Sequence, residues 1–208
     1  MKGDIKDDGG KEHTDSLDEA AQIEKSLYEL AEVIQDPHLA ATIKQIIDAF
    51  ENKKTAIADL AYRDEKTGVF NNIYFTVRLL EEVSRGLRYN RELSLLIIEL
   101  GESFSNNLAN VAAAIAETLR RSDTCARIEG TVFATLLPET TSSQAERVAE
   151  KLLNGIQPFC EESTVEAWIG IADLTADRNN ANKLESAAHR AKDTGKEQNS
   201  PVCTATEI

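Results

Sequence analysis

Two β-rich runs that are separated only by Glu129-Gly130 constrain the fold of this chain more than any other feature. The first run covers residues 124–128 and the second covers residues 131–137. A connection of two residues can join only antiparallel neighbours, and Gly supplies the positive φ that such a turn requires. The chain therefore contains a sheet in which these two runs lie side by side.

Helical and strand patterns alternate on both sides of this hairpin. The run 93–100 is apolar on both faces, which is typical of a central strand. A further strand is predicted around 165–172, and helices are predicted over about 71–90, 108–119, 142–156 and 181–194. The helix at 71–90 is amphipathic, with one face that carries Ile73, Val77, Leu80, Val83, Ser84 and Leu87. This order favours an α+β fold, with a central mixed or antiparallel sheet covered by helices.

The residues before this region differ in composition and in hydrophobic periodicity. Residues 1–15 contain almost nothing to bury, so we expect a disordered tail there. Ser16-Leu-Asp-Glu19 is a capping box, and the helix that it opens ends at Asp36-Pro37. A second helix is predicted over about 39–61, with a seam of Leu39, Ile43, Ile46, Phe50, Ile57 and Leu60. We predict a helical hairpin over 16–61 that either packs on its own domain or, as we favour, forms a homodimer.

Charge and composition argue against several classes of function. The formal net charge of −13 repels phosphate backbones and anionic lipid surfaces, and no Lys/Arg-rich run counteracts it. The chain has no apolar stretch of membrane-spanning length, and its first residues are too polar for a signal peptide. Cys125, Cys160 and Cys203 are too scattered for a disulfide framework or a zinc site. We expect a cytoplasmic protein that needs no metal or cofactor and binds neither nucleic acid nor membrane.

Five stretches between about residues 60 and 202 resemble, in order, the motifs of one family. They are Asp64-Glu-Lys-Thr-Gly-Val-Phe-Asn71 for D-x-L-T-G-L-x-N, 93–100 for the first core strand, 126–138 for R-y-G-G-D-E-F-a-l-l-P, 168–172 for s-i-G-i-A and 191–195 for A-K-x-x-G. These motifs belong to GGDEF domains, the diguanylate cyclases that join two GTP into cyclic di-GMP. The resemblance implies a nucleotidyl-cyclase-type fold over 62–202, with 203–208 as a C-terminal tail.

The turn that carries the acids of active family members is altered here. The family motif G-G-[DE]-E-F is replaced by Glu129, Gly130, Thr131, Val132 and Phe133. In active members the acid at the Val132 position binds a metal together with an Asp on the first core strand, where this chain has Glu99. Valine offers no lone pair to Mg²⁺, and Glu129 repels triphosphate. The family segment F-K-x-i-N-D-x-x-G-H-x-x-G-D is also missing after Glu99, so we expect no cyclase activity.

The R-x-x-D motif, which resembles the product-inhibition site of the family, is present. Arg120, Arg121 and Asp123 stand before the turn at the family spacing. An Arg guanidinium can pair with guanine O6 and N7, and an Asp carboxylate accepts from guanine N–H groups. The family's second basic contact lies on the helix after the hairpin, where Lys151 matches and Arg147 lies one turn earlier.

The same residues allow a simpler interpretation. Basic residues at the end of a helix interact favourably with its dipole, and Asp123 could merely begin a loop. The resemblance nevertheless implies a degenerate GGDEF domain that binds cyclic di-GMP and relays this signal to a protein partner. The alternative is a ligand-independent interaction scaffold of the same fold.

Overall fold

The computed structural model describes residues 25–26, 29, 41–49, 61–160 and 166–205. The chain divides into two compact units, 1–61 and 62–208. Within the first unit the described residues are helical, and along 41–49 Ile43 and Ile47 are buried whereas Ile46 is exposed. The predicted tail over 1–15 and most of the predicted hairpin over 16–61 lie outside the described residues and stay predictions.

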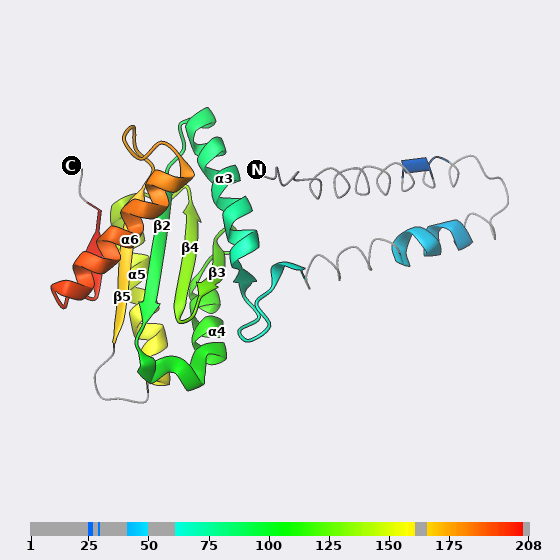
Figure 1. Ribbon diagram of the computed structural model, residues 1–208. Helices are drawn as coiled ribbons and strands as arrows, with labels where there is room; N and C mark the ends of the chain where they lie inside the picture. The colour runs from blue at the N-terminus through cyan, green and yellow to red at the C-terminus, as the bar shows by residue number, and fades with distance from the viewer. Residues whose placement is uncertain (1–24, 27–28, 30–40, 50–60, 161–165, 206–208) are drawn as a thin grey trace, which may run out of the picture. The chain divides into compact units, whose positions relative to one another are not determined.

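The second unit is built on one mixed sheet, which confirms the predicted α+β fold (Figure 1). The strand order is β1 (Phe70–Asn71), β3 (Thr124–Glu129), β4 (Val132–Pro138), β2 (Leu93–Leu100), β5 (Ala167–Asp173) and β6 (Val202–Thr204). The four inner strands pair antiparallel, and the short outer strands β1 and β6 pair parallel to their neighbours. Residues 203–205, predicted as the start of a tail, instead continue the sheet, and the Ala205 N–H bonds to the Ile171 carbonyl.

Helices cover both faces of this sheet. The helices α3 (Asn72–Tyr89) and α6 (Ala181–Glu197) cover the face turned to the viewer in Figure 1, with α4 (Leu108–Thr118) and α5 (Ser142–Ile156) behind it. Short 3₁₀ turns lie at η1 (Glu102–Asn107) and η2 (Gln157–Phe159). Strand β2 contributes to both hydrophobic cores, because Leu96 and Ile98 face one layer while Leu95 and Ile97 face the other. None of the helices in the described part of the chain combines the length and apolarity needed to span a bilayer.

Of the apolar residues on the face predicted for α3, only Val83 is buried. Phe75, Leu79 and Val83 pack on the sheet, whereas Ile73, Val77, Leu80 and Leu87 are exposed. These four residues are between 45% and 64% exposed. Helical spacing identifies apolar stripes but does not decide which stripe meets the sheet, because α3 carries two of them.

The hairpin turn lies one residue later than predicted. Strand β3 continues through Glu129, which pairs with Val132, and Gly130-Thr131 form the connection. Gly130 has the expected positive φ of 44°. The shift is explained by a contact with a distant strand, because the Thr131 hydroxyl donates to the Leu100 carbonyl at 2.8 Å and ties the second turn residue to β2.

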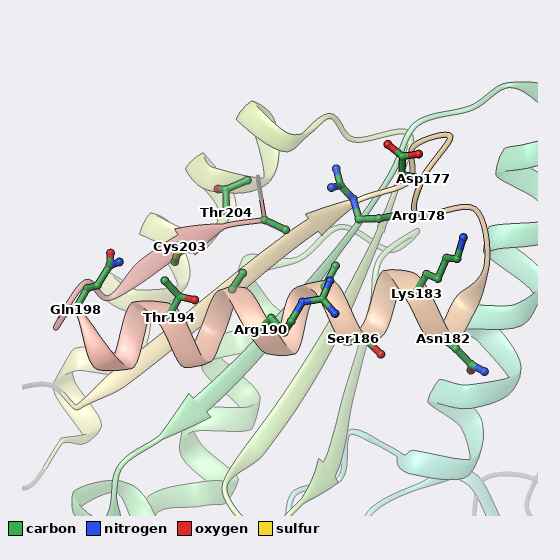
Figure 2. A pocket seen from close by; sticks show the side chains of 13 residues that line it. Asp177, Arg178, Asn182, Lys183, Ser186, Arg190, Thr194, Gln198, Cys203 and Thr204 are labelled. Atoms are coloured by element: carbon green, nitrogen blue, oxygen red, sulfur yellow. The ribbon is translucent and has the colours of Figure 1, made fainter. Parts of the chain in front are cut away.

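A glycine on β5 sets the distance between α6 and the sheet. A Cβ added at Gly170 would lie 2.1 Å from the Ala188 carbonyl oxygen and 2.2 Å from the Lys192 nitrogen. The helix backbone therefore lies directly on the strand. Figure 2 shows how α6 then continues alongside β6, where Gly195 allows a similarly close approach to Cys203.

We expect Gly170→Ala to lower the free energy of unfolding by about 3 kcal/mol, because α6 must move away from the sheet to admit the methyl group. Urea unfolding followed by circular dichroism measures this change. Gly155→Ala in α5 is the matched control, since its added Cβ would meet nothing closer than 3.5 Å. The control should be neutral or more stable by about 0.5–1 kcal/mol, and equal effects of the two substitutions would contradict the proposed role of Gly170.

Candidate functional site

Glu99, at the end of β2, is held by two lysines of α6. Lys192 Nζ donates to Glu99 Oε2 at 2.6 Å, and Lys196 Nζ donates to Glu99 Oε1 at 2.5 Å. The lysines lie one turn apart on α6. Because α6 packs closely on β5 at Gly170, both lysines reach Glu99 on the neighbouring strand β2. Lys196 also lies over the ring of Trp168, the β5 residue that pairs with Glu99. Both carboxylate oxygens of Glu99 are therefore occupied by protein cations.

The pKa values of this cluster keep both partners charged. Burial alone would raise the pKa of Glu99, but hydrogen bonds and the charges of Lys192 and Lys196 outweigh it and lower that pKa below its ordinary value. Burial would likewise lower the pKa of Lys192, but Asp193 and Glu99 raise it above the usual range for lysine. The contact is therefore an ion pair throughout the neutral pH range.

The altered turn lies directly beside this ion pair. Val132 is the register partner of Glu99 on β4, and Phe133 is buried in the core. Glu129 is exposed on the other strand of the hairpin. Among the described residues, no group of three or more His, Cys, Asp or Glu side chains could hold a metal ion. Glu99 thus faces valine and lysine rather than a second carboxylate.

Arg127 of β3 connects the hairpin turn to Asp64. This side chain donates from Nε and NH2 to the Gly130 carbonyl at 2.8 and 2.6 Å, and from NH1 to the Asp64 carboxylate at 3.1 Å. Thr67 donates to the same carboxylate through its hydroxyl at 2.6 Å. Burial would raise the pKa of Asp64, but Thr67 and Arg127 lower it on balance. Asp64 and Thr67 therefore support the geometry of the turn, a role that their sequence motif did not reveal.

The R-x-x-D stretch forms a closed turn. Asp123 Oδ2 accepts from the Arg120 backbone N–H at 2.8 Å, and the Asp123 N–H donates to the Arg120 carbonyl at 3.0 Å. Ser122 donates to Asp123 Oδ1 at 3.2 Å. Helix α4 ends at Thr118 with no basic residue in its last turn, so interaction with the helix dipole does not explain Arg120. The side chains of Arg120 and Arg121 project from this turn and are exposed.

A cavity of about 640 Å³ lies beside this turn and is rich in arginine. It is bounded by the C-terminal half of α3, the start of β2, the end of β4 and the residues after α4. The arginines that line it are Arg78, Arg85, Arg91, Arg120 and Arg121. Three acids, Glu82, Glu92 and Glu139, also line it, so the basic side chains are in excess. We call this the arginine cavity.

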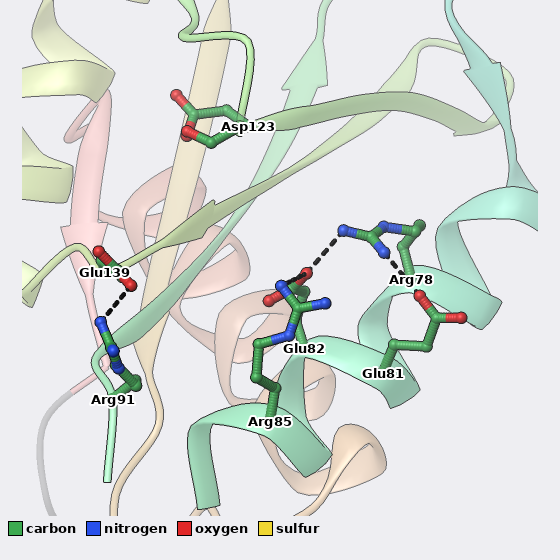
Figure 3. A network of polar contacts seen from close by, with 8 residues as sticks. Arg78, Glu81, Glu82, Arg85, Arg91, Asp123 and Glu139 are labelled. Atoms are coloured by element: carbon green, nitrogen blue, oxygen red, sulfur yellow. Dashed lines mark hydrogen bonds and ion pairs between the residues drawn. The ribbon is translucent and has the colours of Figure 1, made fainter. Parts of the chain in front are cut away.

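Ion pairs hold several of these arginines in place, as Figure 3 shows. Glu82 is only 3% exposed, and its carboxylate accepts from Arg78 NH2 at 2.6 Å and lies 3.3 Å from Arg85 NH1. Arg91 pairs with Glu139 across the start of β2 and the end of β4. Glu81 also accepts from Arg78 NH1 at 2.6 Å, so two carboxylates of α3 hold Arg78 and Arg85 in a defined geometry.

The structure brings the predicted residues together only in part. Arg120 and Arg121 line the arginine cavity, and Asp123 shapes the turn that presents them. Arg147 and Lys151 are exposed on successive turns of α5 and are not among the residues that line it. The contribution of α3 was missed because its arginines lie far from the motif in sequence. The spacing of Arg78 and Arg85, two turns apart on one face, was the available signal.

Comparison with known proteins places this geometry in a family. The family model described as "Diguanylate cyclase, GGDEF domain" matches residues 61–200. The bifunctional diguanylate cyclase/cyclic di-GMP phosphodiesterase MucR of Pseudomonas aeruginosa is 26% identical over an aligned length of 182, and the match covers 78% of this chain. The match spans only 27% of MucR, so the chain covers about a quarter of the length of that relative.

Solved structures agree with this match. The GGDEF domain of TpbB (YfiN) from Pseudomonas aeruginosa superimposes with a TM-score of 0.61 at 26% identity and covers 69% of this chain and 94% of that domain. The coiled coil and GGDEF domain of DgcB from Caulobacter crescentus, in complex with c-di-GMP, gives a TM-score of 0.68 at 15% identity. The second match covers 81% of this chain and 97% of that one, and at this identity it supports the fold alone.

The Glu99 ion pairs generate a testable pH dependence. A carboxylate whose pKa is lowered by folding stabilises the protein above its unfolded pKa of about 4.3, and this contribution is lost as the pH falls through the folded value. We therefore expect Glu99→Gln to destabilise the protein at neutral pH and to lose its difference from wild type in acid. Urea unfolding between neutral pH and the acid range measures this. A difference that persists unchanged into strong acid would contradict the ion pairs as its cause.

Proposed function

Because the chain belongs to the GGDEF-domain family of diguanylate cyclases, we propose that it is a catalytically inactive member that binds cyclic di-GMP at the R-x-x-D turn and acts as an effector. The observation that carries this proposal is the arginine cavity, into which the turn presents Arg120 and Arg121. In a chain with a formal charge of −13, a cavity with more arginines than acids is suited to an anionic ligand.

The chemistry of the ligand matches the groups that surround the cavity. Cyclic di-GMP carries two guanines and two phosphates. The exposed guanidiniums of Arg120 and Arg121 can form bidentate contacts with guanine O6 and N7, and Arg85 offers charge to a phosphate. Asp123 closes the turn through Oδ2. Its Oδ1 accepts one hydrogen bond of 3.2 Å from Ser122 and can also accept from guanine N–H groups. Lys151 and Arg147 remain predicted contacts from α5.

The proposed absence of catalysis rests on the residues around Glu99, at the end of β2 that lies away from the arginine cavity. Cyclase chemistry needs carboxylates that hold Mg²⁺ on the triphosphate of GTP. Here Val132 replaces one of them, and Lys192 and Lys196 occupy both oxygens of Glu99. A metal ion would have to displace two cations from a partly buried carboxylate and would still lack a second anionic ligand. Glu129, which is exposed at the turn, adds a negative charge that repels a triphosphate.

The exposed side of α3 supports the relay of a signal to a protein partner. Ile73, Val77, Leu80 and Leu87 form a solvent-facing apolar stripe on the same helix whose Arg78 and Arg85 line the arginine cavity. Such a stripe is a surface that another protein can cover. The same observation favours the second candidate function, a ligand-independent scaffold of this fold. Homodimerisation through the N-terminal hairpin stays a prediction.

Isothermal titration calorimetry with cyclic di-GMP separates the two candidates. We expect wild type to bind, and Arg120→Ala and Asp123→Ala each to weaken binding by about 1–3 kcal/mol through lost guanine contacts. Added salt should also weaken binding, because the contacts neutralise charge. Arg190→Ala on α6, an exposed arginine outside this cavity, is the matched control and should bind like wild type. Absence of heat with the wild-type protein would favour the scaffold.

The α3 and α5 contacts can be distinguished in the same titration. Arg85→Ala should weaken binding if the ligand occupies the arginine cavity, because that side chain lines it. Lys151→Ala should weaken binding if the ligand extends toward α5 as the sequence predicts. An effect of Lys151→Ala with none from Arg85→Ala would place the ligand outside the cavity.

Incubation with GTP and Mg²⁺, followed by chromatography of the nucleotides, tests the loss of catalysis. We expect no cyclic di-GMP from wild type, and none from the Val132→Glu variant, because Glu99 remains engaged by Lys192 and Lys196. Product formation by wild type that disappears in Glu99→Gln would show that the turn still supports the reaction.

A further inference from the structure

A second cavity, of about 800 Å³, lies between α6 and the end of the sheet. One wall is the side of α6 that carries Lys183, Arg190 and Thr194, and the other includes Cys203 and Thr204, as Figure 2 shows. Ala205 also lines the cavity. Strand β6 is the last strand in the sheet formed by the described residues. The cavity is therefore an open groove between a helix and a sheet edge, which we call the β6 groove.

The backbone of β6 turns part of its hydrogen-bonding groups toward this open edge. The Ile169 N–H bonds to the Pro201 carbonyl at 2.8 Å, and the Ala205 N–H bonds to the Ile171 carbonyl at 2.7 Å. In a parallel pair, alternate residues bond to the same neighbour, so the backbone groups of Val202 and Thr204 point away from β5. The Val202 carbonyl already accepts an outward-side bond from the Ser200 hydroxyl at 3.0 Å. An edge with such groups can template an additional strand.

The helix wall of the groove is held at a fixed distance from this edge. A Cβ added at Gly195 would lie 2.8 Å from the Ser200 carbonyl oxygen and 3.1 Å from Cys203 Cβ. The Ser200 N–H also bonds to the Gly195 carbonyl at 2.7 Å. The two walls are thus joined at the end of α6, which makes the groove a formed feature rather than a gap that side chains can close.

The charges that line the groove are mainly positive. Its basic residues are Arg178, Lys183 and Arg190, and its acidic residue is Asp177. Arg178 is buried and fixed to Asp173, with NH2 2.7 Å from Oδ1. Lys183 and Arg190 are exposed on α6, so their charges are available to a ligand. The positive charge is on the α6 wall, where Lys183 and Arg190 outnumber Asp177, and it favours an acidic occupant on that side. On the strand itself, the Thr204 hydroxyl donates to Glu146 of α5 at 2.7 Å.

We propose that the β6 groove binds an extended acidic segment of a partner protein, which pairs as an added strand with β6 while its acidic side chains meet Lys183 and Arg190. Backbone pairing supplies the affinity in this mode of recognition, and the side chains on the helix wall supply selectivity. This interaction surface lies apart from the arginine cavity, which shares no lining residue with it. It therefore does not depend on cyclic di-GMP binding.

Titration of the isotope-labelled chain of residues 1–208 with a short peptide of alternating Glu and Val tests the proposal by NMR. We expect the amide resonances of Val202 and Thr204 to shift, and a peptide of alternating Lys and Val to bind at least about tenfold more weakly because of charge repulsion. A Glu-Val peptide that is N-methylated at alternate residues should also bind about tenfold more weakly, since it loses backbone hydrogen bonds.

The double variant Lys183→Glu with Arg190→Glu changes exposed side chains only and should fold normally. It should reverse the preference between the acidic and the basic peptide. Arg88→Glu, an exposed arginine of α3, is the matched control and should keep the preference of wild type. Failure of the acidic peptide to bind at millimolar concentration, or shifts away from β6, would overturn the proposal. If the amide resonances of Val202 and Thr204 shifted with protein concentration in the absence of peptide, the groove would instead bind a second copy of the chain, and the proposal would be overturned.

Discussion

The close approach of α6 to β5 at Gly170 is the contact on which the rest of the sheet face depends. With the helix backbone directly on the strand, Lys192 and Lys196 reach across to Glu99 on β2. The same helix then runs close enough to β6 for Gly195 to pack against Cys203. Two glycines thus set the position of α6: Gly170 brings its lysines to Glu99 at the end of β2, and Gly195 sets the width of the β6 groove.

The two ends of β2 differ in electrostatic character. At its end, Glu99 is neutralised by two lysines, so little net charge remains for a metal or a phosphate. At its start, Arg91 and the arginines of α3 and of the R-x-x-D turn outnumber the acids around one cavity. Because the strand between these ends is buried on both faces, it holds the two regions at a fixed separation.

The candidate site was only partly predictable from the sequence. The R-x-x-D spacing identified Arg120 and Arg121, and the structure shows that Asp123 organises their turn through the Arg120 N–H. The lysines that neutralise Glu99 could not be assigned to it, because they lie 93 and 97 residues away along the chain. The spacing of Arg78 and Arg85 showed that they share a face of α3, but it could not show which cavity they line, since local patterns carry no information about which distant elements meet.

The sequence by itself determined the order and type of the main elements and the identity of the altered turn, because periodicity, capping residues and turn residues act over a few neighbouring positions. It left open which stripe of α3 meets the sheet, the short strands β1 and β6, and the exact place of the hairpin turn. Those features depend on contacts between distant segments, such as Thr131 with Leu100 and Ala205 with Ile171. Only the tertiary structure decided them, because their free energy comes from packing and pairing that no local pattern contains.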